Sequence, residues 1–355
     1  MPNEPARQTT LRTVLITLGV VSLVLIGLYL LRSFAATLLL IFAGILFGLL
    51  LRGCAAFLQK HLHLQSHLAL GIVLALIAGS VALFLWLAGP QAARQIQTLS
   101  EQLPQSLGLL QNRLEQYDWG RALLASLPSL GSMQISFASL LGSVTQAFSI
   151  TLEVVGAFVF IFFLGLYLAA SPGLYLEGAL LLLPKARRAR GREVMISLGV
   201  ALRWWLLGRF VTMTLMGILT ALALWLANIP LALVLGIIAG LLLFIPYLGA
   251  IVAAVPAILV GLMDSPTRAL WVLVIYTGVH LFEGYCITPF VQKRAVALPP
   301  ALLLSVQILA AALFGMMGII FSTPLMVVTI VLIQALYSHD VLGEKVALLG
   351  QHEKA

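Results

Sequence analysis

The sequence predicts an all-α membrane protein with about eight hydrophobic segments, and three observations lead to this fold class. Of the 355 residues, 61% are hydrophobic and only 9% are charged, whereas soluble domains carry about 25% charged residues. Apolar windows of about 20 residues, the length that a helix needs to cross the hydrocarbon, recur along the chain. Two further apolar regions are longer and are interrupted by Pro and Gly. A globule of this length cannot hide so much apolar surface, so its solvent must be lipid.

The apolar segments divide into single crossings and interrupted regions. Single transmembrane helices are predicted at 14–31, 34–51, 68–89, 150–170, 204–227 and 269–287. The first is interpreted as a retained helix and not as a signal peptide, because it is long enough to span the membrane and no small-residue cleavage site follows it. Regions 231–263 and 301–337 are too long for one crossing and too short for two. Each contains a proline near its middle, Pro246 or Pro324, and each is predicted to be a re-entrant hairpin or a broken helix that crosses twice.

Four parts follow along the chain. Residues 1–89 are predicted to form three transmembrane helices, and residues 90–149 an extracytoplasmic amphipathic helical segment that acts as a lid, a rim or a surface connector. Residues 150–337 are the predicted transport core, with a cytoplasmic basic loop at 171–203, and residues 338–355 are a cytoplasmic tail. With both termini cytoplasmic, most of the 20 Lys and Arg lie on the inner side, as the positive-inside rule requires.

Several function classes lack their sequence signatures. The chain has no HExxH, GxSxG or GxxxxGK[ST] motif and no paired intramembrane aspartates, so we expect neither an enzyme nor a cofactor. His61, His63 and His67 lie in one polar loop without carboxylates or cysteines nearby, and no metal site is expected. The net charge of +8 is explained by membrane orientation and does not indicate nucleic acid.

Two charged residues stand at membrane depth, where a charge usually faces the interior of the bundle and often marks a transport path. Glu283 lies near the end of its predicted helix, one turn after His280, and Arg209 lies one turn into another. Both helices enter from the same side, so we expect the two charges to pair. The alternative is that each side chain extends to the interface.

Irregular backbone at membrane depth occurs only where it is buried in protein or lines a wet cavity. Broken segments in corresponding positions often form the substrate site of a secondary transporter. Two stretches have this character: IPYLG at 245–249, and GMMGIIFSTP, which is predicted to break between Gly315 and Pro324. A structural kink is the alternative for either one alone.

The same stretches carry a family resemblance. LLLFIPYLGAIVAAVPAILVGL, EGYCITPFVQKRAVALPPALLL and GMMGIIFSTPLMVV, in that order and preceded by LLGRF, resemble the autoinducer-2 exporter family of predicted permeases. The resemblance implies a multi-pass protein of the bacterial inner membrane, in a family named for members that export autoinducer-2 and including others that look like sodium/proton antiporters. The motif positions are Arg209, Pro246, Tyr247, Gly249, Pro256, Glu283, Pro289, Pro299, Gly315, Gly318 and Pro324.

Three functions are compatible with these observations. The leading one is a secondary exporter of a small polar solute, such as autoinducer-2 or a related metabolite. The second is a sodium (or lithium)/proton antiporter in which Glu283 binds the ion and the proton in turn. The third is a membrane scaffold without transport. We expect a solute, a coupling ion (proton or sodium) and the lipid bilayer as partners, and a homo-oligomer. Small residues such as those of Ala43–Gly48 are expected to pack helices together, either within one subunit or between subunits.

Overall fold

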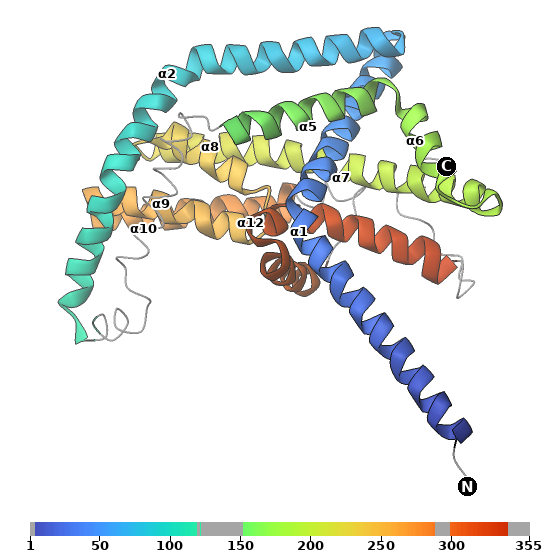
Figure 1. Ribbon diagram of the computed structural model, residues 1–355. Coiled ribbons are helices and arrows are strands. Elements are labelled where there is room, and N and C mark those ends of the chain that lie inside the picture. The colour runs from blue at the N-terminus through green and yellow to red at the C-terminus, as the bar shows by residue number, and fades with distance from the viewer. Residues whose placement is uncertain (1–3, 119–120, 122–151, 288–298, 340–355) are drawn as a thin grey trace.

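The computed structural model describes residues 4–118, 121, 152–287 and 299–339, and every regular element in these residues is helical (Figure 1). The elements are α1 (Glu4–Leu62), α2 (Ser66–Glu115), α5 (Leu152–Ala170), α6 (Pro172–Leu181), η1 (Lys185–Arg187), α7 (Arg188–Leu226), α8 (Ala232–Leu242), α9 (Leu248–Asp264), α10 (Pro266–Phe282), η2 (Glu283–Ile287), α12 (Pro300–Leu332) and η3 (Ile333–His339). Within the described residues, five helices are long and apolar enough to cross a membrane, or six if the bent pair α5–α6 counts as one span. The predicted all-helical membrane fold class is confirmed, and the count of about eight hydrophobic segments stays a prediction.

The first two predicted spans, 14–31 and 34–51, form one continuous helix, α1. The prediction of two separate helices was wrong, because only Arg32 and Ser33 separate the two apolar runs and neither residue breaks a helix. At 1.5 Å per residue, α1 is about 88 Å long, about three times the thickness of the hydrocarbon. Its N-terminal part extends away from the bundle in Figure 1. The placement of the N-terminus on the cytoplasmic side stays a prediction.

The third predicted span also continues without interruption. α2 runs past the predicted domain boundary at residue 90 and through Pro90 and Pro104 into the polar segment. Figure 1 shows α2 running along the top of the bundle and then turning down across its left end, and a proline inside a helix is a frequent cause of such a bend. In its second part, Leu99 is 1% exposed and packs with residues of α8, α9 and α10. The polar segment therefore begins as an arm that covers one end of the bundle.

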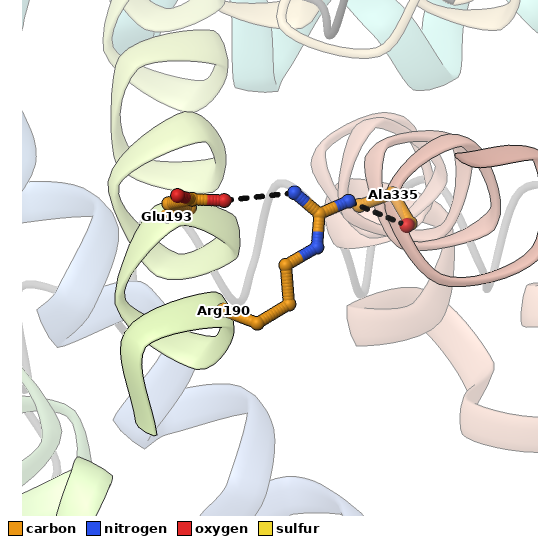
Figure 2. A network of polar contacts seen from close by, with 3 residues as sticks. All are labelled: Arg190, Glu193 and Ala335. Atoms are coloured by element: carbon orange, nitrogen blue, oxygen red, sulfur yellow. Dashed lines mark hydrogen bonds and ion pairs between the residues drawn. The ribbon is translucent and has the colours of Figure 1, made fainter. Parts of the chain in front are cut away.

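The predicted basic loop at 171–203 is largely helical. α5 and α6 meet at 92°, η1 follows, and α7 then continues for 39 residues from the basic cluster into the bundle. Arg190 of α7 donates hydrogen bonds to Glu193 at 2.8 Å and to the main-chain carbonyl of Ala335 in η3 at 3.0 Å (Figure 2). Arg192 pairs with Glu177 of α6. These arginines therefore join α6, α7 and η3 on the side of the bundle opposite the α2 arm.

Small residues let helices approach closely at two places. Gly48 of α1 faces Gly165 of α5, where an added Cβ would lie 2.9 Å from the Gly165 carbonyl oxygen. Gly217 of α7 faces Gly236 and Gly240 of α8 in the same way. Such contacts hold membrane helices together where the lipid supplies no hydrophobic driving force. The stretch Ala43–Gly48 thus packs inside the subunit and gives no support to an oligomer interface.

Candidate functional site

The first interrupted region forms a hairpin of two helices, α8 and α9, that we call the first hairpin. α8 has 11 residues and α9 has 17, which correspond to about 16 Å and 25 Å. The hydrocarbon is about 30 Å thick. Because α8 is too short to cross it, its length favours a re-entrant hairpin over two full crossings.

The tip of the first hairpin, residues 243–247, contains a γ-turn centred on Tyr247. Tyr247 has φ 62° and ψ −60°, and the Leu248 N–H donates to the Pro246 carbonyl at 2.7 Å across it. This turn is rare and strained for a residue with a side chain. It arises because Pro246 has no N–H to continue α8, and Tyr247 has to reverse the chain before α9 begins. Strained backbone of this kind persists only where the surroundings hold it, often at functional sites.

A glycine follows each break. A Cβ on Gly249 would lie 1.8 Å from the Leu242 carbonyl oxygen, and a Cβ on Gly318 would lie 2.0 Å from the Ala310 carbonyl oxygen. These distances are much shorter than a van der Waals contact. In each region the two arms therefore lie too close together to leave room for a side chain at the glycine. Ala310 and Gly318 would be far apart in a straight helix, so α12 doubles back on itself. We call its two parts, 300–314 and 316–332, the second hairpin.

The second hairpin breaks at Gly315 and not at Pro324. Gly315 has φ 63° and ψ −146°, a conformation that is open almost only to glycine. Pro324 lies inside the helical part that follows. The prediction that Pro324 interrupts this region was wrong: its missing N–H removes one helical hydrogen bond but does not reverse the chain here. Figure 1 shows the two parts of α12 running in different directions near the centre of the molecule.

Two side chains from other elements donate hydrogen bonds to the tip of the first hairpin. Arg209 of α7 donates to the Leu243 carbonyl, and Gln307 of α12 donates to the Pro246 carbonyl at 3.1 Å. Both carbonyls lack a helical partner because the helix has ended. The contact of Gln307 also joins the two hairpins directly.

Glu283 contacts His280 and not Arg209, contrary to the pairing that we expected. The His280 Nδ1 and Glu283 Oε2 atoms are 3.1 Å apart, and the side chains are 29% and 16% exposed. The Arg209 hydrogen bond goes to the main-chain carbonyl of Leu243. Glu283 begins η2, a π-helical turn, and such turns are frequent at functional sites.

Several buried polar atoms near these elements have no hydrogen-bond partner within the described part of the chain. They are Arg209 Nε, Tyr276 Oη, Gln307 Oε1 and Thr323 Oγ1. Leaving a buried donor or acceptor unpaired costs about 1–3 kcal/mol. A water or a bound polar molecule would remove that cost.

The structure thus gathers only some of the predicted site residues. Pro246 and Tyr247 lie in the tip of the first hairpin, Gly249 follows the tip in α9, and Arg209 of α7 contacts the tip through Leu243. Gly315 and Gly318 shape the second hairpin, while Pro256 is buried inside α9 and Pro289 lies outside the described residues.

Sequence reasoning missed Gln307, which the fold brings to the first tip. A signal was present, because Gln307 and Ser305 are the two polar residues in the otherwise apolar run 301–315.

The class of protein follows from these features: a multi-pass helical membrane protein whose two interrupted hairpins meet through a buried hydrogen bond. The chain matches the family described as AI-2E family transporter over residues 18–338, and it belongs to that family. It is 25% identical to "Putative transport protein YueF" of Bacillus subtilis over 66% of this chain and 63% of that protein.

Two further relatives carry similar names. The chain is 29% identical to "Putative transport protein YrrI" of Bacillus subtilis over 46% of each chain. It is 25% identical to "Putative transport protein sll0060" of Synechocystis over 76% of this chain and 79% of that protein. The chain therefore spans about half to two thirds of the length of the two Bacillus relatives.

Proposed function

We propose that this protein is a secondary transporter of the bacterial inner membrane that exports a small, polar, uncharged solute, with autoinducer-2 as the first candidate. The observation that carries the proposal is the tip of the first hairpin. There, main-chain carbonyls without helical partners accept hydrogen bonds from the side chains of Arg209 and Gln307. Polar main chain at membrane depth needs either protein partners or a wet path beside it. Membership of a transporter family supports the same function.

The charges around the tip favour an uncharged solute. Arg209 and Glu283 have opposite formal charges, so the pair adds no net formal charge to the site. A site without net charge offers an ionic solute little compensation for the water that the solute has to lose. A polar molecule without charge costs less to transfer and can use the unpaired donor and acceptor atoms.

The test is efflux from vesicles that contain the purified full-length protein. Vesicles loaded with autoinducer-2 should release it faster than protein-free vesicles, and Tyr247→Ala should slow the release. Tyr167→Ala is the matched control, because Tyr167 is also an exposed tyrosine but lies on α5. Efflux at the protein-free rate would remove autoinducer-2 as the solute.

Sodium (or lithium)/proton antiport is the second candidate, and the contact between His280 and Glu283 favours it. A histidine beside a carboxylate can hold a proton between them, and a cation could replace that proton. Addition of sodium or lithium to vesicles with an acidic interior should then dequench a pH-sensitive dye inside them, and Glu283→Gln should abolish the signal. Glu177→Gln is the control, because Glu177 is paired with Arg192 and is 58% exposed.

A scaffold without transport would behave differently from both. It would keep its function after substitution of Tyr247 or Glu283, and would lose it after deletion of residues 90–149.

We also propose that the protein works as a homo-oligomer and that a proton or sodium gradient drives the export. Mass measurement in lipid nanodiscs checks the first statement, and efflux with each gradient collapsed in turn checks the second.

A further inference from the structure

Gln307 is one of the most deeply buried polar side chains in the described part of the chain, with 1% of its surface exposed. One end of its amide is used: Nε2 donates to the Pro246 carbonyl at 3.1 Å. The other end, Oε1, is buried and accepts no hydrogen bond from the described residues. Burial of an unpaired acceptor is costly, and Met or Leu would fill a similar volume without that cost.

The free oxygen lies where the two hairpins meet. The Pro246 carbonyl accepts from both the Leu248 N–H and Gln307, so the amide touches the strained turn itself. Arg209 donates to the Leu243 carbonyl, three residues earlier, which puts the two carbonyls within about 11 Å along the chain. Arg209 Nε also has no partner among the described residues. An unpaired acceptor and an unpaired donor thus stand beside the same short break.

We propose that the junction between Gln307 and Pro246 lies on the solute pathway, and that Gln307 Oε1 binds the solute by accepting a hydrogen bond from a hydroxyl or N–H group. This inference rests on the proposed transport function and adds to it a contact residue and the chemistry that it recognises. A neutral amide accepts such a donor without adding charge to the site. The main-chain bond at Nε2 fixes the amide, so Oε1 is already oriented before the solute arrives.

A site that is built to hydrogen-bond a solute discriminates strongly against analogues without the matching group, because its own polar atom is then left unpaired. Gln307 would therefore determine selectivity as well as affinity. Because Oε1 is buried, the solute reaches it when the packing around this atom opens and water enters, while the bond from Nε2 to the Pro246 carbonyl stays in place.

The first experiment needs no knowledge of the solute. In full-length protein with Cys54→Ser and Cys286→Ser, Gln307→Cys is treated in lipid vesicles with the water-soluble thiol reagent MTSET. The control is Val331→Cys, also on α12 and 0% exposed, but inside an apolar core. We expect the cysteine at position 307 to react at least about tenfold faster than the control. Equal rates would overturn the proposal.

Should Gln307→Cys fail to fold, Ala310→Cys repeats the experiment from the next turn of the same arm, where Ala310 is 7% exposed. Its reaction at the rate of the control would overturn the proposal in the same way. Size-exclusion chromatography of each variant decides which one is used.

The second experiment measures autoinducer-2 efflux by Gln307→Met. Loss of one hydrogen bond to the solute should raise the half-saturating concentration about threefold to tenfold, with the maximal rate within about twofold of wild type. Gln334→Met is the matched control, because Gln334 also has a buried Oε1 without a partner in the described residues but lies in η3. A fall in maximal rate with an unchanged half-saturating concentration would contradict a solute contact.

The two experiments separate this inference from the proposed function. If wild-type vesicles release no autoinducer-2, the candidate solute is wrong, while the labelling of position 307 still decides whether the junction is on an aqueous path. If release occurs and position 307 stays unlabelled, export stands and the role of Gln307 is wrong.

Discussion

The two hairpins reverse the chain by different means. In the first, Pro246 ends α8 and Tyr247 takes a strained turn, and side chains from α7 and α12 bond to the carbonyls that are left free. In the second, Gly315 alone supplies the conformation that the reversal needs. Both regions use a glycine, Gly249 or Gly318, where the two arms meet.

The difference shows that the strained backbone at Tyr247 and the polar contacts that support it both belong to the first hairpin. A glycine reversal costs little and needs no support, so the second hairpin can pack with apolar neighbours. A tyrosine reversal is held only by its surroundings, which here include two polar side chains from distant segments. The first hairpin is therefore the one whose shape responds to what happens elsewhere in the bundle.

The largest loss of stability is expected at the feature that the two hairpins share, the glycine where their two arms meet. Gly249→Ala and Gly318→Ala would each place a methyl group within about 2 Å of a carbonyl oxygen, and the arms would have to separate. We expect each to lower the free energy of unfolding by at least about 3 kcal/mol. Thermal unfolding in detergent measures this, with Gly278→Ala as the control because an added Cβ there meets nothing within 4 Å. Tolerance of only one substitution would show that the two tips are packed differently.

The next effect should be confined to the first hairpin. Arg209→Met removes a charged hydrogen bond to the Leu243 carbonyl, and such bonds contribute about 1.5–3 kcal/mol. Hydrogen–deuterium exchange should become faster in α8 and at the tip, but not in 316–332. Arg268→Met is the control, since Arg268 makes a half-exposed ion pair with Asp264 that contributes at most about 1 kcal/mol. Equal acceleration in both hairpins would mean that they are not separate units.

Substitutions at the two chain reversals should change the free energy of unfolding in opposite directions: Tyr247→Gly should raise it and Gly315→Ala should lower it. Tyr247→Gly relieves a positive φ that costs about 1–3 kcal/mol, but adds about 0.5–1 kcal/mol of backbone entropy to the unfolded state. We expect a net gain in stability of about 1 kcal/mol, together with slower export. Gly315→Ala forces a residue with a side chain into a backbone conformation that favours glycine, and it should lower the free energy of unfolding by about 1–3 kcal/mol. Destabilisation by both changes would contradict the assignment of strain to Tyr247.

The smallest effect tests the arm of α2, which packs against the first hairpin and α10. Gln95 Oε1 accepts from the Val234 N–H at 3.1 Å and so caps the N-terminus of α8 from a distant helix. Gln95→Ala should cost about 1 kcal/mol, as loss of a helix cap does. Gln97→Ala, which removes only an exposed contact with Glu101, should cost about 0.3 kcal/mol. Equal costs would show that the cap contributes nothing.

The sequence was a good guide wherever composition or local chemistry decides the outcome. The all-helical membrane fold follows from apolar windows, and the reversal at Pro246 follows from a residue that cannot continue a helix. Gly315 and Gly318 stood inside a predicted break, although the weight given to Pro324 there was wrong. A proline tolerated within a helix and a glycine that reverses the chain look alike in a sequence.

What the sequence could not supply are contacts between distant segments. The bond from Gln307 to Pro246 joins residues 61 positions apart, and the bond from Gln95 to Val234 joins residues 139 positions apart. Neither follows from helical periodicity. The continuity of α1 was missed for a different reason, since hydrophobicity locates apolar runs but not the turns between them.

The long separation between Gln307 and Pro246 also orders events during biosynthesis. When the first hairpin leaves the ribosome and enters the membrane, the residue that completes its tip has not been made. The Pro246 carbonyl then has only the Leu248 N–H, and the strained turn lacks its support from α12. The tip of the first hairpin therefore reaches its final form only after the second hairpin has been inserted, although it precedes the second in the chain.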